Sequence, residues 1–522
     1  MSHSSDPKAT NYAIAPNANR LLWAGFMAIL AAGVGFSVRG ASVLGEWSKA
    51  FGFTQTELGG ITGGGLVGFG VIIILSSFIA EKIGYGKLMT FAFVIHFLSA
   101  VVTLIAPWVF TAFGKDATFW CLFSGMFMFA IGNGVCEAVV NPLVATLFPN
   151  NKTHYLNILH AGWPAGLILG GVAAIFLAGQ VSWQVQISLF LIPVVLYGLM
   201  IFGQKMPATE ASARGVGIGE ILIQFASPLL LFLLAIHAMV GYVELGTDSW
   251  ISRITGSILD QTTGQWLFVY TSSLMFILRF VAGPIVHKIS PLGLLFASAV
   301  LATIGLFTLG GVQTTIAAIL ALTIYGVGKT FFWPTMLAIV SERYPKGGAV
   351  TLGIIGGVGM LSAGLLGGPG IGFKQDKFAS EKLQELSPDT FARYKSDKEN
   401  SFLVFKTNGL NGAKVDTLDT DGKKLAQEMD ILRSTNSSDK NLEDLDAWWS
   451  NAKETAEADK KPVTEATLFG SRMALKVTAI VPAVMAVCYL LLIGYFKSIG
   501  VYKPVEIDGE KLTGGVEGPM EA

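Results

Sequence analysis

Residues 131–148 read IGNGVCEAVVNPLVATLF, an apolar segment that contains the polar side chains Asn133, Glu137 and Asn141. These positions are four residues apart, so a helix carries all three on one face. A carboxylate in the hydrocarbon of a bilayer is costly unless it faces a cavity or a partner. Pro142 follows, and a proline inside a helix removes a backbone hydrogen bond and favours a bend. The segment is therefore predicted to span a membrane, with its polar stripe turned towards the interior of a helical bundle.

The composition of the whole chain is that of a multi-pass membrane protein. Of its 522 residues, 52% are hydrophobic and only 14% are charged, whereas soluble proteins carry about a quarter charged residues. Apolar runs of about 20 residues, the length that crosses the bilayer core, follow one another along the chain. The formal net charge is zero, so nothing favours nucleic acid as a partner. The predicted fold class is all-α and polytopic.

Twelve spans in two halves of six are predicted. The spans are 20–44, 58–80, 87–112, 117–143, 155–179, 183–203, 228–251, 263–285, 290–312, 315–341, 347–373 and 473–499. The segments between and around them are the tails 1–19 and 500–522, the linker 204–227 between the halves 20–203 and 228–499, and the charged insertion 374–472. The similarity of LNILHAGWPAGLILGG (156–171) to TLGIIGGVGMLSAGLLGG (351–368) suggests that the halves arose by duplication.

The distribution of lysine and arginine predicts the orientation in the membrane. The short loops on one side hold only Lys49, Lys115 and Arg253, whereas the segments on the side of the N-terminus hold thirteen lysines and arginines. Because basic loops remain in the cytoplasm, both termini and the linker are predicted inside a plasma (inner) membrane, with 374–472 outside. This insertion is expected either to be solvated, without chemistry, or to form a small, partly ordered cap.

The chain shows no motif of an enzyme or of a metal or cofactor site. Cys121, Cys136 and Cys488 all lie in apolar runs, where they are expected to be small buried residues. Neither a nucleophile–base motif nor a nucleotide-binding loop GxxxxGK[ST] is found, so transport driven by ATP is not predicted. We expect a monomer without cofactors, whose partners are the bilayer, a small solute and a proton.

The loop after the second span resembles a signature of the major facilitator superfamily. In FIAEKIGYGKLM (78–89), the acid, base and glycine positions of that signature are occupied by Glu81, Lys82, Gly84 and Lys87. A weaker copy, FVAGPIVHKISPLG (280–293), contains Lys288 and lies where the second half should repeat it. The resemblance implies gate loops that hold one closed state until the two halves rock.

The stretch CEAVVNPLVATLFP and the following LNILHAGWPAG resemble the fucose permease branch of sugar:proton symporters. Glu137, Asn141 and Asn157 match that branch, and His160 stands where it often has glutamine. In span seven, YVELGTDSWI resembles its pattern of Tyr, Glu and a later Ser-Trp. The chain departs from the branch in span one, where GFSVRGASVL carries Arg39 and no acid. The resemblance implies proton-coupled uptake of a monosaccharide or a similar polyhydroxylated solute.

Two sets of candidate site residues follow. The proton-coupling candidates are Glu137, Glu244 and His160. The solute-binding candidates are Asn133, Asn141, Asn157, Trp163, Lys329, Trp333, Arg39 and Asp248. For each of them the alternative is a structural role, such as a hydrogen bond between helices or packing. Lys329 needs a counter-ion, which Glu137 or Glu244 is expected to supply, and Arg39 is expected to reach towards water.

Two rival functions remain open at this point. Arg39, Lys329 and Arg279 are also suited to bind a carboxylate, which favours a carrier of organic anions such as sugar acids. A non-transporting sensor, which uses the insertion to bind a partner, belongs to a different class. Retention of uptake after deletion of 374–472 distinguishes a transporter from such a sensor.

Overall fold

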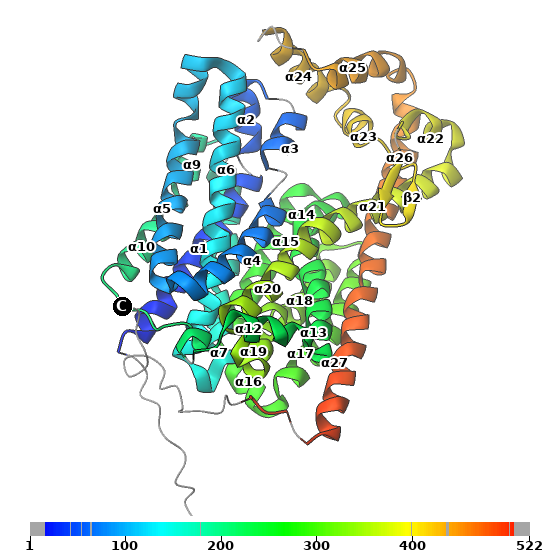
Figure 1. The fold of residues 1–522 in the computed structure, drawn as a ribbon. Helices are drawn as coiled ribbons and strands as arrows, with labels where there is room; N and C mark the ends of the chain where they lie inside the picture. Colours follow the sequence, from blue (N-terminus) through cyan, green and yellow to red (C-terminus); the bar gives the residue numbers. More distant parts are fainter. Residues whose placement is uncertain are drawn as a thin grey trace, which may run out of the picture.

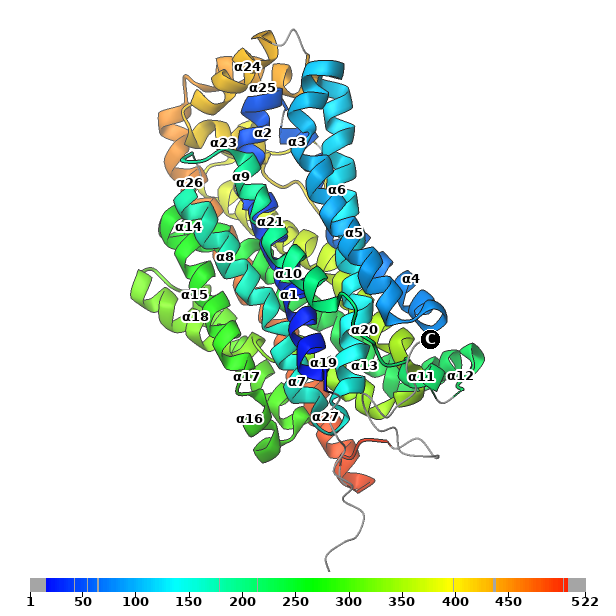
Figure 2. The same ribbon diagram turned by 90° about the vertical axis from the view of Figure 1, so that its left-hand side faces the viewer.

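Two helical bundles stand side by side in the computed structural model, and a smaller helical cap lies beyond one end of them (Figure 1). The structure describes residues 16–41, 43–53, 55–62, 65–177, 179–213, 215–397, 399–434, 438–500 and 502–505. The linker, the first described residues of the chain and its last described segment, 502–505, lie at the end opposite the cap (Figures 1 and 2). We call these the linker end and the cap end.

The first bundle corresponds to the predicted N-terminal half. Its helices are α1 (Ala18–Ala41), α2 (Leu44–Phe51), α3 (Gln55–Thr62), α4 (Gly65–Ile83), α5 (Tyr85–Leu104), α6 (Ala106–Leu147), η1 (Pro149–Asn151), α7 (Lys152–His160), α8 (Gly162–Leu177), α9 (Trp183–Ser188) and α10 (Leu191–Ile201). The predicted loop between spans three and four is a kink at Gly114, whose φ of 81° suits glycine. The element α6 therefore includes the end of span three and the whole of span four.

The linker and the second bundle follow. Their elements are α11 (Glu210–Ala213), α12 (Ile218–Ile223), η2 (Gln224–Ala226), α13 (Pro228–Gly241), η3 (Tyr242–Gly246), α14 (Thr247–Ile258), α15 (Gln261–Arg279), α16 (Ala282–Ile289), α17 (Pro291–Leu309), α18 (Thr315–Lys329), α19 (Phe332–Arg343), η4 (Pro345–Gly347), α20 (Gly348–Ser362), η5 (Ala363–Gly367), α21 (Gly368–Leu386) and α27 (Ile480–Ser498). The segments η3 and η5 are single π-helical turns inside spans seven and eleven.

The number of spans agrees with the prediction. Among the described residues, eleven helical segments are long and apolar enough to cross a bilayer. The remaining predicted span is α15, whose sequence QTTGQWLFVYTSSLMFILR is more polar but which packs between α14 and α18 like its neighbours. Polar residues are tolerated there because the helix faces other helices rather than lipid alone.

Glycine allows two equivalent helix pairs to cross closely, one in each half. A methyl group on Gly166 of α8 would overlap the carbonyl of Leu30 on α1. On Gly241 of α13, it would overlap the carbonyl of Gly359 on α20. Spans one and five therefore pack in the first half as spans seven and eleven do in the second, which agrees with a duplication.

The insertion is folded, and spans eleven and twelve are longer than predicted. Helix α21 continues to Leu386, and α26 (Ala456–Thr478) runs back beside it. Between them lie α22 (Pro388–Tyr394), β1 (Asn400–Phe402), β2 (Phe405–Thr407), α23 (Gly412–Asp419), α24 (Lys423–Ser434) and α25 (Lys440–Ala452). Leu383, Tyr394, Leu418 and Val463 are fully buried in its small core. The fully solvated alternative is therefore wrong, and the segment is an ordered cap.

Candidate functional site

Six polar side chains are buried together between the two halves. They are Glu137 and Asn141 on α6, His160 on α7, Glu244 on η3, Arg279 on α15 and Trp333 on α19. None of them is more than 6% exposed. We call this group the central cluster.

Glu137 is held from both halves. Asn141, one helical turn further along α6, donates from Nδ2 to Glu137 Oε1 at 3.1 Å. Trp333 of the other half donates from Nε1 to the same oxygen at 3.3 Å. His160 Nε2 lies 3.7 Å from Glu137 Oε1 and donates to Asn141 Oδ1 at 2.8 Å. The bond from Trp333 crosses between the halves and therefore depends on their relative position, whereas Asn141 and His160 belong to the same half as Glu137.

Arg279 makes the most extensive contacts of the cluster. Its Nη2 donates to Glu244 Oε1 at 2.8 Å, its Nη1 to the carbonyl of His160 at 2.6 Å, and its Nε to the carbonyl of Thr330 at 2.9 Å. One guanidinium therefore binds a carboxylate of span seven and backbone carbonyls of spans five and ten. The planar arrangement of its donors suits arginine and not lysine.

Two prolines explain why those carbonyls are free. A proline in a helix has no N–H for the carbonyl four residues earlier. Pro164 frees the carbonyl of His160 in this way, and Pro334 frees that of Thr330. Both prolines follow a tryptophan, and the helix assignment breaks just before each tryptophan–proline pair. The repeated pair thus creates two acceptors, and Arg279 satisfies both.

Glu244 lies on the π-helical turn η3. Its Oε1 accepts from Arg279, and its Oε2 accepts from the backbone N–H of Trp333 at 3.3 Å. The turn packs against η5, where a methyl group on Gly246 would lie 2.6 Å from the Cα of Gly367. Short π-helical turns are frequent at functional sites.

The expected pairing of Lys329 with Glu137 or Glu244 is wrong. Lys329 forms a buried ion pair with Asp248, which lies one turn beyond Glu244. A break at residues 330 and 331 separates Lys329, at the end of α18, from Trp333 of α19. Trp333 donates to Glu137, whereas Lys329 pairs with Asp248 of span seven.

The predicted amides and Trp163 surround the cluster. Asn133 Oδ1 accepts from His96 Nε2 at 2.9 Å, and the other nitrogen of His96 lies 2.9 Å from the hydroxyl of Tyr197. Asn157 donates to the carbonyl of Thr153 at 2.8 Å and to Thr335 of the other half at 3.4 Å. The indole N–H of Trp163 is buried and has no hydrogen-bond partner in the described part of the chain.

Arg39 does not reach towards water as expected, since it is only 1% exposed. Its guanidinium carbon lies 4.2 Å from the ring centre of Phe129 and 5.0 Å from that of Phe190. Nη2 donates to Ser99 at 3.4 Å, but Nε and Nη1 have no hydrogen-bond partner among the described residues. Arg39 is therefore a buried cation stabilised by aromatic rings, without a carboxylate.

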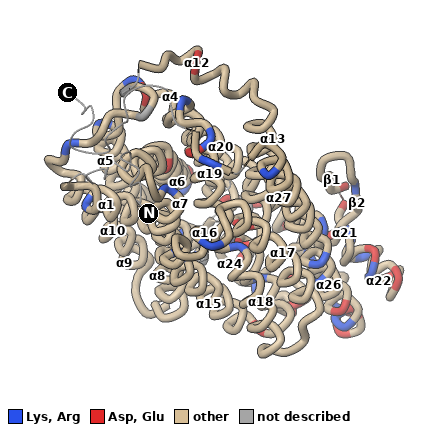
Figure 3. Tube along the Cα trace, turned by 90° about the horizontal axis from the view of Figure 1, so that it is seen from below, with Lys and Arg blue, Asp and Glu red and all other residues tan. Residues whose placement is uncertain are grey.

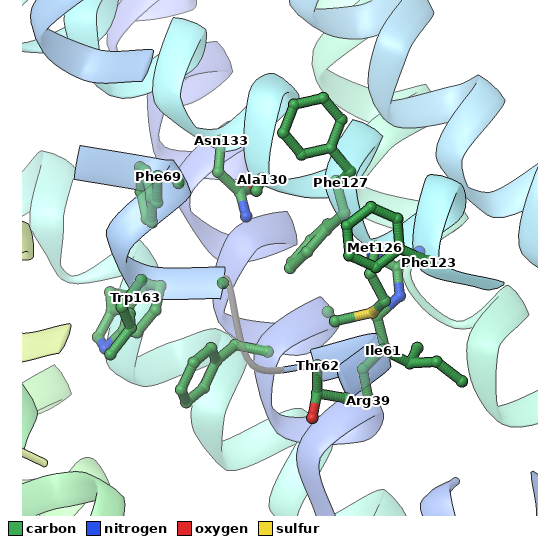
Figure 4. A pocket seen from close by; sticks show the side chains of 16 residues that line it. Arg39, Ile61, Thr62, Phe69, Phe123, Met126, Phe127, Ala130, Asn133 and Trp163 are labelled. Carbon is green, nitrogen blue, oxygen red and sulfur yellow. The ribbon is translucent and has the colours of Figure 1, made fainter. Parts of the chain in front are cut away.

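Three cavities lead from the cap end to the central cluster. The first, of ≈ 860 Å³, is bounded by α3, α14, α21 and β1. It shares Thr62 with a second cavity of ≈ 400 Å³ among α1, α3, α4, α6 and α8, lined mostly by aromatic and aliphatic side chains (Figure 4). The second shares Phe69, Asn133 and Trp163 with a third, of only ≈ 30 Å³, inside the cluster. Together they outline a path that narrows towards Glu137.

Contacts between the halves close the linker end. Glu81 of the first gate loop accepts from the backbone N–H of Ala349 at the start of α20 at 2.7 Å, and from the hydroxyl of Thr209. Lys152 donates to the hydroxyl of Ser341 at 3.0 Å. A carboxylate at a helix N-terminus is favoured by the helix dipole.

The other predicted gate residues form no such bond between the halves in the described structure. Gly84 turns the chain after α4 with a φ of 81°. Lys82, Lys87 and Lys288 are exposed.

Sequence analysis did not assign Arg279 or His96 to the site. Arg279 was noted only as a possible anion ligand next to the second gate loop, and His96 was not considered. The available signal was charge complementarity, because a buried arginine requires a carboxylate and span seven supplies Glu244. Arg279 also binds two backbone carbonyls that helix breaks leave free. No local sequence pattern predicted that these breaks lie next to α15.

Comparisons with known proteins agree with this architecture. The sequence profile described as Major Facilitator Superfamily matches residues 22–368. No curated protein matches the sequence.

Solved structures share the fold at low identity. The E. coli fucose:proton symporter FucP is 18% identical with a TM-score of 0.55, covering 69% of this chain and 92% of that one. The proton:xylose symporter XylE is 15% identical with a TM-score of 0.56, covering 66% and 86%. An inward-facing bacterial homolog of the human lysosomal transporter Spinster is 14% identical with a TM-score of 0.59, covering 94% and 99%.

The gate contacts predict the effect of Glu81→Gln. A charge-assisted hydrogen bond contributes about 1.5–3 kcal/mol, so its loss should raise the population open at the linker end by about tenfold or more. We expect a cysteine at Thr351, a buried residue near the start of α20, to react correspondingly faster with a maleimide in detergent-solubilised protein whose native cysteines have been removed. Lys497→Gln, at an exposed position near the end of α27, is the control. Equal rates in Glu81→Gln and the control contradict the gate.

Arg279→Met should destabilise the protein by about 3–5 kcal/mol, because it leaves Glu244 as an uncompensated buried charge. Adding Glu244→Gln should restore only part of that loss, since the two carbonyls freed by the prolines stay unpaired. Denaturant unfolding in detergent measures both changes, with Arg433→Met on the exposed face of α24 as control. Full recovery in the double variant would show that the carbonyl bonds contribute nothing.

Proposed function

The chain belongs to the Major Facilitator Superfamily, and we propose that it is a proton-coupled symporter that takes up a monosaccharide or a similar polyhydroxylated solute by alternating access. Its membership makes it a membrane transporter. The proton, the solute class and the direction are our proposal. The observation that carries it is the charge balance of the central cluster, in which two buried carboxylates face one buried guanidinium.

The charge balance supports a bound proton. Arg279 neutralises Glu244, and Lys329 is already neutralised by Asp248. Glu137 is left with His160 as the only basic side chain within ion-pair distance in the described structure. A lone carboxylate in a medium of low dielectric is costly, and a proton on Glu137 or His160 removes that cost. The pair is therefore suited to bind and release one proton.

Solute binding is supported by the cavity beside this pair. The amide of Asn133 points into the ≈ 400 Å³ cavity, and Trp163 lies on its wall (Figure 4). Aromatic side chains suit the apolar face of a sugar ring, while Asn133 and the unpaired indole N–H of Trp163 suit its hydroxyls. Both residues also line the small cavity that contains Glu137. A solute there lies next to the proton site, which makes the two binding events interdependent.

The path of the solute follows from the orientation that the basic residues predict. We assign the linker end to the cytoplasm, so the structure represents a state closed towards the inside. Solute then enters from the cap end, and Asn400 and Ser401 of the cap line the first cavity. Rocking of the halves must break the contacts of Glu81 and Lys152 to release it inside.

Arg39 favours a second candidate, a carrier of organic anions. It is the buried cation that forms no ion pair in the described part of the chain, and it lines the larger apolar cavity. A carboxylate with an apolar body would complement both features. Lys329 and Arg279 do not support this candidate, because each already has a carboxylate partner.

Glu137→Gln tests the coupling. The amide imitates the protonated acid, so the variant should bind and exchange solute but no longer accumulate it on a proton gradient. Counterflow and pH-driven uptake in proteoliposomes measure the two activities, with Cys136→Ala on the same helix as control. Accumulation by Glu137→Gln would exclude Glu137 as the coupling residue, and His160 or Glu244 would then be examined in the same way.

Arg39→Met separates the two solute classes. A ligand that binds only the folded state raises the unfolding temperature. We expect monosaccharides to raise it equally in the wild type and in Arg39→Met, because the sugar site uses Asn133 and Trp163. Stabilisation by sugar acids or apolar carboxylates that disappears in Arg39→Met, but not in Arg433→Met, would favour the anion carrier instead.

A further inference from the structure

The hairpin of the cap ends in an exposed apolar tip. Strands β1 and β2 pair Phe402 with Phe405, so Leu403 and Val404 form the turn. Leu403, Val404 and Phe405 are 72%, 86% and 58% exposed. Other large apolar side chains of the cap, such as Tyr394 and Leu418, are buried in its core. Such a cluster of exposed apolar side chains usually marks an interaction surface.

The backbone of the tip favours the same interpretation. Leu403 has a φ of 54°, a conformation that side chains other than glycine rarely adopt. Two-residue hairpin turns usually place glycine, asparagine or aspartate at such a position. Keeping leucine there, followed by valine, retains apolar side chains at the expense of local strain. A turn selected only to reverse the chain in water would not need them.

The tip lies at the depth where the spans end. Phe402 packs against α21 near its start, since a methyl group on Gly370 would lie 2.7 Å from the ring, and the rings of Phe402 and Phe373 are 5.9 Å apart. Further along α21, the carbonyl of Gln375 faces Gly470 of α26.

The neighbouring Arg472 donates to the carbonyl of Val312, just after α17 ends, at 3.3 Å. Phe402 contacts α21 at Gly370 and Phe373, which precede Gln375 along the helix. At 1.5 Å per residue, Phe402 therefore lies about 3–8 Å deeper along α21 than the level of Gln375, where α17 also ends. The turn formed by Leu403 and Val404 continues in the same direction, away from the Asn400–Asp376 contact of 3.2 Å.

The hairpin is also outside the helical bundle. Viewed from below, β1 and β2 lie at the rim, beyond α13 and α27 (Figure 3). The polar side of the hairpin lies nearer the cap, where Lys406 and Glu399 form an exposed ion pair of 2.8 Å. An apolar tip below an ion pair is the arrangement of a segment that lies in a membrane interface.

We propose that the tip Leu403–Phe405 inserts into the interfacial region of the bilayer at the cap end and anchors the cap to the lipid. Each side chain removed from water stabilises this contact by the hydrophobic effect. The anchor fixes the hairpin beside the first cavity, which Asn400 and Ser401 line. The proposal depends on the position of the spans and not on the transported solute.

The test uses the full chain in liposomes. A cysteine replaces Val404 in a background in which Cys121, Cys136 and Cys488 are changed to alanine, and it is labelled with the environment-sensitive dye NBD. We expect blue-shifted emission and quenching by lipids that carry a shallow doxyl group, at least about twofold stronger than at the control position. The control is a cysteine at Leu386, an exposed residue at the far end of α21.

Phe405→Cys provides a second position on the same tip, in case one variant fails to insert or fold. Emission and quenching equal to those of the Leu386 control at both positions would overturn the proposal. A blue shift in liposomes, together with resistance of the turn to added protease, would support insertion into the bilayer, since lipid protects the buried turn.

Discussion

The structure depends on the contacts of Arg279. A guanidinium in the middle of a membrane protein is tolerated only when its donors are satisfied, and Arg279 binds Glu244 and two backbone carbonyls. Those carbonyls are available because Pro164 interrupts span five of the first half and Pro334 interrupts span ten of the second half. The prolines therefore do more than bend helices. Pro164 frees the carbonyl through which Arg279 of the second half binds the first, and Pro334 frees the carbonyl that holds Arg279 within its own half.

The charge of the cluster follows from the same contacts. Since Arg279 is matched by Glu244, it is not available to neutralise Glu137, and the ion pair of Lys329 with Asp248 removes the other cation. Glu137 is left with His160 within ion-pair distance, and we propose that the transported proton binds to this pair, beside the cavity lined by Asn133 and Trp163. A cluster in which every carboxylate had its own arginine or lysine would be stable but would have no reason to bind a proton.

Sequence patterns predicted the membrane part well and the site in part. Period, length and charge placed the spans, because a bilayer leaves a helix few alternatives. The α6 stripe was predicted correctly as one helical face, since no break separates Asn133 from Asn141. The partner expected for Lys329 was wrong, because sequence spacing alone does not place α18 relative to span seven, where Asp248 and not Glu244 lies next to Lys329. The sequence left two alternatives open for the insertion, a solvated segment and a small cap, because the apolar residues of its core are dispersed among charged residues.

The position of these contacts explains how the halves can rock without separating. The bond from Arg279 to the carbonyl of His160 crosses between the halves in the cluster, between the cavities of the cap end and the closed linker end. In a rocking motion, displacement grows with distance from such a point, so Glu81 and Lys152 at the linker end move furthest and lose their contacts first. The central bonds of Arg279 change least. They are suited to serve as the pivot. In the function proposed above, the bond from Trp333 to Glu137 would link the state of the proton site to the position of the second half.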